Sequence, residues 1–92
     1  MKSSSLRTIR RILGKHKVRR AALFGSAARA QERAGSDIDI LFDPPPRFSL
    51  FDMAGMKEEL ELSLDRNVDL VTFSSVNRLL KTRIDRDTKP IL

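Results

Sequence analysis

The feature that most constrains this chain is an apolar segment in which acidic residues alternate with large hydrophobic ones. Residues 36–42 read Ser-Asp-Ile-Asp-Ile-Leu-Phe, and such alternation is typical of a β-strand with two different faces. Asp37 and Asp39 point to one side, together with Leu41, while the other side carries Ile38, Ile40 and Phe42 and is expected to pack on helices. Two neighbouring carboxylates repel each other and need a compensating cation. Mg²⁺ suits such a pair, because it takes oxygen ligands and shares them with substrate phosphates.

The segment before this strand has the composition of a phosphate-binding turn. An apolar strand predicted at 18–24 ends in Gly25-Ser26, and a short helix is expected at 26–33 with Ser26 as its N-cap. Small residues and free backbone N–H groups at such a turn can hold a phosphate. Arg29 lies one helical turn further, where it either reaches a phosphate or pairs with an aspartate. Ser36 is expected to orient the start of the next strand or to hydrogen-bond a carboxylate. Together these parts indicate a site for a nucleoside triphosphate and its metal.

The combined run, Gly25-Ser26-Ala27-Ala28-Arg29 followed by Ser36-Asp37-Ile38-Asp39, resembles the signature of the minimal nucleotidyltransferase (MNT) family. This family belongs to the DNA polymerase β-like superfamily, whose signature is Gly-Ser, a spacer and Asp-x-Asp. Ala30 stands where the family usually has glycine. The superfamily has a third carboxylate on a later strand, and Asp69 within residues 67–72 matches it. The resemblance covers residues 18–80.

The resemblance implies an α+β nucleotidyltransferase fold, a small mixed β-sheet with helices packed on one face and carboxylates on the other. It implies that Asp37, Asp39 and Asp69 are catalytic and hold two Mg²⁺ ions. It also implies that the nucleotide is bound by Gly25, Ser26, Arg29 and Ser36. The implied reaction moves AMP from ATP to an acceptor hydroxyl. Members of the family are often encoded beside a helical HEPN protein, so the implied acceptor is a HEPN-type toxin and the chain its antitoxin. The alternative is a non-catalytic antitoxin that neutralises its partner by contact.

Length and composition set further limits. Ninety-two residues are expected to form a single domain over 1–92. The chain has no cysteine, which is compatible with a cytoplasmic protein, and no apolar run near the ~20 residues of a membrane span. Residues 1–20 contain eight Lys or Arg and no acid, so they either form a solvated helix face or attract polyphosphate, nucleic acid or an acidic partner. Nucleic acid is the less favoured partner, because the chain has five Phe and no Trp or Tyr for base stacking.

Hydrophobic periodicity supplies the remaining elements. Leu6, Ile9 and Leu13 predict a helix over 5–14, with Gly14 as its stop. Ser49 and Asp52 resemble a capping box. They open a helix to Leu64 with an expected buried stripe of Leu50, Met53, Ala54, Leu60 and Leu64. Further elements are expected as a strand at 68–72, a helix from Ser74 or Ser75 to Ile84, and a short edge strand at Ile91-Leu92.

Overall fold

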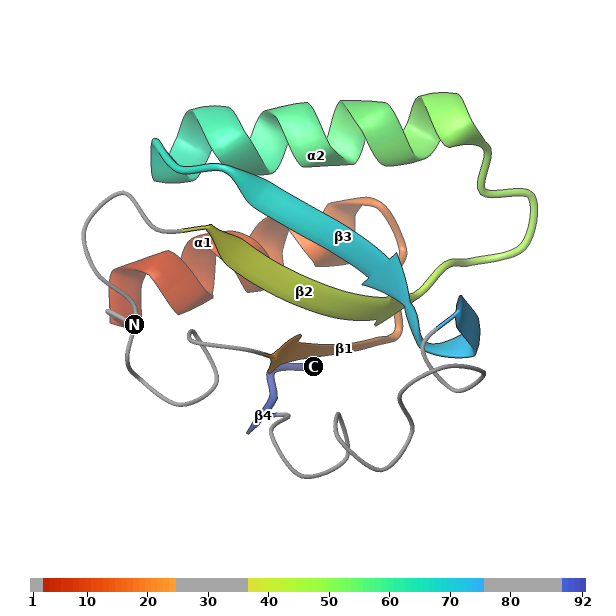
Figure 1. Ribbon diagram of the computed structural model, residues 1–92, viewed down its shortest axis with the longest axis horizontal. Helices are drawn as coiled ribbons and strands as arrows, with labels where there is room; N and C mark the ends of the chain where they lie inside the picture. Colours follow the sequence, from red (N-terminus) through yellow and green to blue (C-terminus); the bar gives the residue numbers. More distant parts are fainter. Residues whose placement is uncertain (1–2, 25–36, 76–88) are drawn as a thin grey trace.

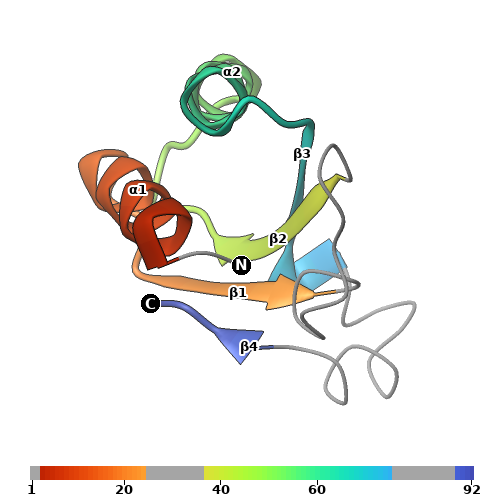
Figure 2. The ribbon, with the colours of Figure 1, turned by 90° about the vertical axis from the view of Figure 1, so that its left-hand side faces the viewer.

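Two helices cover one face of a small mixed sheet (Figures 1 and 2). The computed structural model describes residues 3–24, 37–75 and 89–92. Within these ranges the elements are α1 (Ser3–Lys15), β1 (Arg20–Phe24), β2 (Ile38–Asp43), α2 (Leu50–Leu64), β3 (Val68–Thr72) and β4 (Lys89–Pro90). The sheet order is β3-β2-β1-β4. Strand β1 runs antiparallel to β2 and β4, whereas β2 and β3 are parallel. The predicted α+β class and mixed sheet are therefore confirmed.

Several predicted boundaries shift or fall outside this description. The helix expected at 26–33 lies outside the described residues, and so does the last helix beyond Ser75. The first turn of that last helix begins at Phe73, and the hydroxyl of Thr72 accepts the backbone N–H of Ser75 at 3.2 Å, so Thr72 caps it. The edge strand pairs two residues earlier than expected, with Pro90 opposite Ala22. Neither described helix is long and apolar enough to cross a membrane.

Helix α1 ends in a Schellman motif that Gly14 does not form. The N–H of Val18 donates to the carbonyl of Leu13 at 3.0 Å, and the N–H of Lys17 donates to the carbonyl of Gly14 at 3.0 Å. Lys17 takes the left-handed conformation, with φ of 63°, a position that glycine usually occupies. Leu13 and Val18 are both buried, as the hydrophobic contact of this motif requires. The stop predicted at Gly14 was therefore wrong by three residues.

Helix α2 begins as predicted, and its predicted buried stripe is confirmed in part. The Ser49 hydroxyl accepts the N–H of Asp52 at 3.1 Å, and the Asp52 carboxylate accepts the N–H of Ser49 at 2.9 Å, which confirms the capping box. The residues that pack on the core are spaced three and four apart: Met53, Met56, Leu60 and Leu64. Leu50 is 83% exposed and Ala54 is also exposed, so their predicted burial was wrong. Both lie more than a quarter turn away from the line through Met56 and Leu60.

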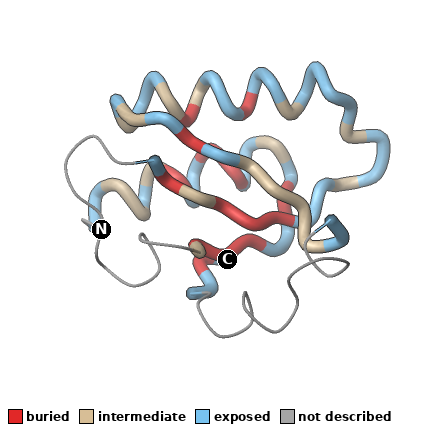
Figure 3. The backbone as a smooth tube through the Cα atoms, in the orientation of Figure 1, coloured by how far each residue is buried: buried red, intermediate tan, exposed pale blue. Residues whose placement is uncertain are grey.

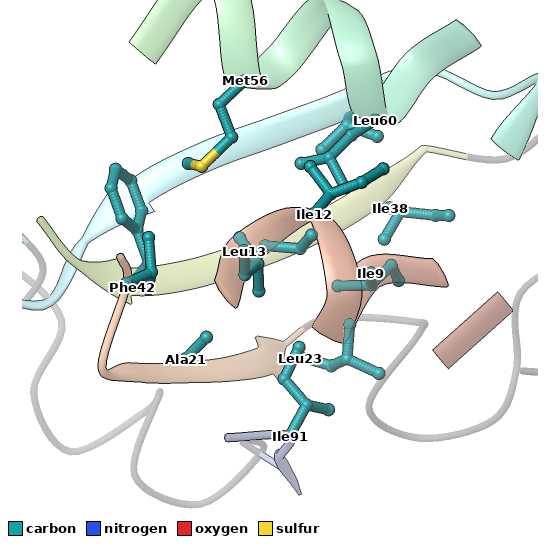
Figure 4. Close-up of a cluster of buried hydrophobic side chains, with 13 residues drawn as sticks. Ile9, Ile12, Leu13, Ala21, Leu23, Ile38, Phe42, Met56, Leu60 and Ile91 are labelled. Atoms are coloured by element: carbon teal, nitrogen blue, oxygen red, sulfur yellow. The ribbon is translucent and has the colours of Figure 1, made fainter. Parts of the chain in front are cut away.

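The core lies between the helices and the sheet (Figures 3 and 4). Its central residues are fully buried and come from every layer: Ile9 and Leu13 of α1, Ile38, Ile40 and Phe42 of β2, and Met56 and Leu60 of α2. This confirms the predicted apolar face of β2. Leu41 is also fully buried, although it points to the other face and lies outside this cluster.

The two helices are also joined by a polar contact. His16 Nε2 lies 2.9 Å from Glu59 Oε1, and Lys15 Nζ lies 2.9 Å from Glu59 Oε2. The hydrogen bonds from His16 and Lys15 lower the pKa of the Glu59 carboxyl. Glu59 therefore has its charge partners within the fold and is committed to the α1–α2 contact.

The difference between the two sides of α2 predicts how the same substitution acts at two nearby positions. Leu60→Ala opens a cavity in the core and should lower the free energy of unfolding by about 2–5 kcal/mol. Leu62→Ala, two residues away on the same helix, removes a side chain that is 77% exposed and should change it by no more than about 0.5 kcal/mol. Urea unfolding followed by circular dichroism measures both. Equal losses in the two variants would contradict this assignment of the helix faces.

Candidate active site

Two aspartates lie opposite each other on the central parallel strand pair. In the register of β2 with β3, Asp39 is the partner of Asp69. The neighbouring residues Ile38 and Val68 are fully buried in the core. Because side chains alternate along a strand, both carboxylates point to the face opposite the helices. The pair therefore sits on the side of the sheet that the two described helices leave uncovered, where Leu41 is buried, Asp39 is half-buried and Asp69 is exposed.

The environment of Asp39 disfavours its charge. Its pKa is raised from 3.8 to about 6, first by partial burial, then by the charge of Asp69 and a hydrogen bond between the two carboxyl groups, and finally by the charge of Asp37. All of these causes are features that a bound cation would offset. The Asp39 carboxyl therefore keeps its proton to a higher pH than an ordinary aspartate, and a positive charge bound at the pair would favour its ionised form.

The other predicted site residues do not belong to this carboxylate pair in the described part of the chain. Asp37 is exposed, just before β2 begins, and acts on Asp39 through its charge. Among the described residues, no group of three or more His, Cys, Asp or Glu side chains is arranged so that it could hold a metal ion. The described arrangement is therefore a carboxylate pair with a third acid at its rim. The predicted nucleotide-binding residues lie outside the described ranges: Gly25, Ser26, Arg29 and Ser36.

Asn67 and Glu61, which no sequence motif singles out, hold the pair in register. The carbonyl of Asn67 accepts the N–H of Ile38 at 2.9 Å, which aligns the starts of β2 and β3. The Glu61 carboxylate accepts the N–H of Val68 at 2.9 Å, which joins the end of α2 to the start of β3. Asp69 follows directly. No periodicity or motif signals these two contacts, because both depend on how α2 returns to the sheet.

The Asp39–Asp69 pair has the chemistry to bind a divalent cation together with a substrate phosphate. Carboxylate oxygens on an open face are the ligands that a hard divalent cation takes, and such an ion shares its coordination with substrate phosphates. The raised pKa of Asp39 and its contact with Asp69 fit this use. They fit a purely structural role less well, since a structural acid would be expected to meet a base.

Comparison with known proteins gives the class of this fold and site. Residues 7–92 match the family model described as "Polymerase beta, Nucleotidyltransferase". The chain belongs to this nucleotidyltransferase family, and its class is therefore that of enzymes that transfer nucleotides. The resemblance stated from the Gly-Ser and Asp-x-Asp motifs is confirmed.

Individual relatives narrow the comparison. A Methanocaldococcus jannaschii protein named "Putative protein adenylyltransferase" is 44% identical over 81 residues, which cover 88% of this chain and 87% of that protein. A crystal structure of a toxin–antitoxin with AMP-PNP matches with a TM-score of 0.81 and 25% identity, over 95% of this chain and 72% of the other. The MNT antitoxin in complex with a tri-AMPylated HEPN toxin of Shewanella oneidensis shares the fold, with a TM-score of 0.77 and 23% identity over 100% of this chain and 72% of the other.

The raised pKa of Asp39 predicts a pH-dependent effect of Asp39→Asn in metal-free protein. In the unfolded chain this carboxyl ionises near 3.8, whereas in the folded chain it ionises near 6. The folded state therefore loses stability as pH rises between these values, and the full penalty applies above the folded pKa. With allowance for solvent screening, we expect Asn to stabilise the protein by about 1 kcal/mol at pH 7.5, or about 4–8 °C in melting temperature.

The stability gain of Asp39→Asn should disappear at pH 4, where the Asp39 carboxyl of the wild-type protein is protonated in the folded state. Asp43→Asn is the matched control, because Asp43 is exposed at the end of the same strand. Thermal melts in EDTA across this pH range provide the measurement. A large loss of stability in Asp39→Asn at pH 7.5 would show that the carboxylate is structural.

Proposed function

We propose that this chain is a Mg²⁺-dependent adenylyltransferase that moves AMP from ATP to a hydroxyl of a HEPN-type partner protein and thereby acts as an antitoxin in the cytoplasm. The observation that carries the proposal is the Asp39–Asp69 pair, opposed in register on the sheet face away from the two described helices, where the raised pKa of Asp39 is one that a bound cation would offset. Membership of the nucleotidyltransferase family supports the same reaction class.

The residues divide the reaction between them. Asp37, Asp39 and Asp69 would hold two Mg²⁺ ions. When bound, two such ions stabilise the attacking and the leaving oxygen of a phosphoryl displacement. The acceptor oxygen attacks the α-phosphorus, its bond forms as the bond to the β-phosphate oxygen breaks, and pyrophosphate leaves. Asp69 is proposed to take the proton of the acceptor hydroxyl. Gly25, Ser26, Arg29 and Ser36 are proposed to bind the nucleotide phosphates.

The donor and the acceptor are proposed from the relatives. The 44% identical relative is named as an adenylyltransferase acting on protein, and a similar structure was solved with the ATP analogue AMP-PNP. A fold neighbour is an antitoxin bound to an AMPylated HEPN toxin.

The metal requirement predicts how ATP binds. Without a cation, the acidic pair repels the triphosphate as well as itself, so ATP affinity should be at least tenfold weaker in EDTA than in Mg²⁺. Isothermal titration calorimetry under both conditions measures this difference. Adenosine is a useful control ligand, since it lacks phosphates and should bind equally in both buffers. Equal affinity for ATP in EDTA would contradict the metal site.

The proposed roles of the acids predict loss of transfer in a double variant. Asp37→Asn with Asp39→Asn should reduce AMP transfer at least 10³-fold, because the reacting phosphates lose the charge that places their metal. The assay incubates this chain with α-³²P-labelled ATP, Mg²⁺ and a HEPN-type candidate partner protein, and follows label on that protein. Asp43→Asn, on the same strand, should retain wild-type transfer.

A cell-growth assay separates catalysis from neutralisation by contact. If the double variant transfers no AMP but still protects cells from the partner as well as wild type does, the chain is a binding antitoxin and the catalytic proposal is wrong. Loss of both transfer and protection, with a folded variant that still binds the partner, supports adenylylation as the neutralising step.

A further inference from the structure

The outward side of α2 carries large apolar residues in a straight line. Phe51 is 88% exposed and Leu62 is 77% exposed. They lie eleven residues apart, which is close to three whole helical turns, so they share one face of the helix. Met56 and Leu60, on the opposite face, are fully buried. Figure 3 shows the outer side of α2 as exposed along its length. The helix therefore has one apolar side in the core and a second one in water.

The space between Phe51 and Leu62 is open and shallow. Gly55 lies on the same line, one turn after Phe51, and a Cβ atom added to it would meet nothing within 4 Å. Ala54 beside it is exposed. Small residues flanked by large ones form a shallow saddle into which another helix can pack closely. We define the outer α2 face by Phe51, Ala54, Gly55, Glu58 and Leu62.

Acidic groups continue this face toward the end of α2. A hollow of about 310 Å³ is lined by Leu62 itself together with Glu61, Asp65, Arg66 and Asn67. Residues 50–66 contain five acids and two bases. Glu59 is already bonded to Lys15 and His16, and Glu61 accepts the N–H of Val68. Glu58 and Asp65 are exposed, and neither forms a salt bridge within the described part of the chain. With five acids against the two bases Lys57 and Arg66, the formal charge of this stretch is −3 (2 − 5), which an apolar occupant with positive charge would complement.

The two described helices of a second copy of the chain meet this requirement poorly. The exposed side of α1 is basic, with Arg7, Arg11 and Lys15, but it has no large apolar residue to cover Phe51 and Leu62. An antiparallel contact between two α2 helices would pair each Phe51 with the Leu62 of the other copy. It would also bring the two Glu58 carboxylates close together at the centre, where like charges repel.

We propose that the outer α2 face docks a basic amphipathic helix of the acceptor protein, with its apolar side on Phe51 and Leu62 and a Lys or Arg in the acidic hollow. Apolar anchors spaced along one helix face are the usual means by which proteins recognise a helix, and large aromatic anchors dominate the affinity of such contacts. The identity of the occupant as the acceptor rests on the proposed function.

The position of the hollow connects docking with catalysis. Asn67 lines the hollow, and its carbonyl accepts the N–H of Ile38, the residue before Asp39. The hollow thus adjoins the end of the sheet that carries Asp39 and Asp69. Because the carboxylates lie on the other face of the sheet, a helix docked along α2 and anchored at the hollow would hold its protein at this edge of the sheet, and a hydroxyl elsewhere on that protein would reach round the edge to the nucleotide.

The test uses two synthetic peptides of 18 residues with capped ends. Each has Leu at i, i+4, i+7 and i+11 in an Ala-rich helix, and they differ only in six flanking positions, which are Arg in one and Glu in the other. In ¹⁵N-detected titrations without nucleotide, the Arg peptide should shift amides of residues 50–66 saturably and bind at least tenfold tighter than the Glu peptide. Phe51→Ser with Leu62→Ser should weaken it at least tenfold. Leu92→Ser, which alters a 43% exposed leucine elsewhere, should leave it unchanged.

Three results would overturn the proposal: no saturable binding of the Arg peptide, binding that the Phe51/Leu62 variant does not weaken, or equal binding of the Glu peptide. Sedimentation that shows a wild-type dimer dispersed by the same variant would also overturn it and assign the face to a second copy. The Asp37→Asn, Asp39→Asn variant should bind the peptide like wild type, so a failure of catalysis and a failure of docking give different results.

Discussion

The parallel pairing of β2 with β3 is the interaction on which the site depends. It sets Asp39 opposite Asp69, and a slip of one residue would turn one of these carboxylates into the core. The register is held from both sides. Ile38, Ile40 and Val68 are fully buried on the helix side, and the carbonyl of Asn67 fixes the first rung. The hydrophobic core therefore does more than stabilise the fold, because its burial pattern determines which face carries the acids.

This placement makes the site costly for the folded protein. Partial burial and two acidic neighbours raise the pKa of the Asp39 carboxyl. The folded state therefore tolerates this negative charge less well than the unfolded chain does. Functional sites commonly carry such a penalty, and the remainder of the fold offsets it. Here the compensation comes from the fully buried cluster that joins α1, α2 and the sheet, together with the contact of Glu59 with Lys15 and His16.

The sequence predicted those features that depend on local pattern and failed where tertiary contacts decide. The alternation over 37–42 correctly gave β2 and its two faces, and Ser49 with Asp52 correctly gave the start of α2. Gly14 was a reasonable helix stop by composition, yet the contact of Leu13 with Val18 carried the chain on to a left-handed Lys17. The spacing predicted Asp37 and Asp39 on one face and the family resemblance added Asp69, which the register places opposite Asp39. The two contacts that position β3, through Asn67 and Glu61, have no sequence signal.

The stripe predicted for α2 was right at Met53, Leu60 and Leu64 and wrong at Leu50 and Ala54. The helix carries apolar residues on more than one side, so periodicity alone did not exclude those two from the core. Packing on the sheet selected Met56 and Leu60, and left Phe51 and Leu62 in water. Single exposed leucines are common on protein surfaces, but an aligned aromatic and leucine beside an acidic hollow form a surface with its own specificity. The feature that made the helix ambiguous to sequence reasoning is thus the feature that a partner helix would recognise.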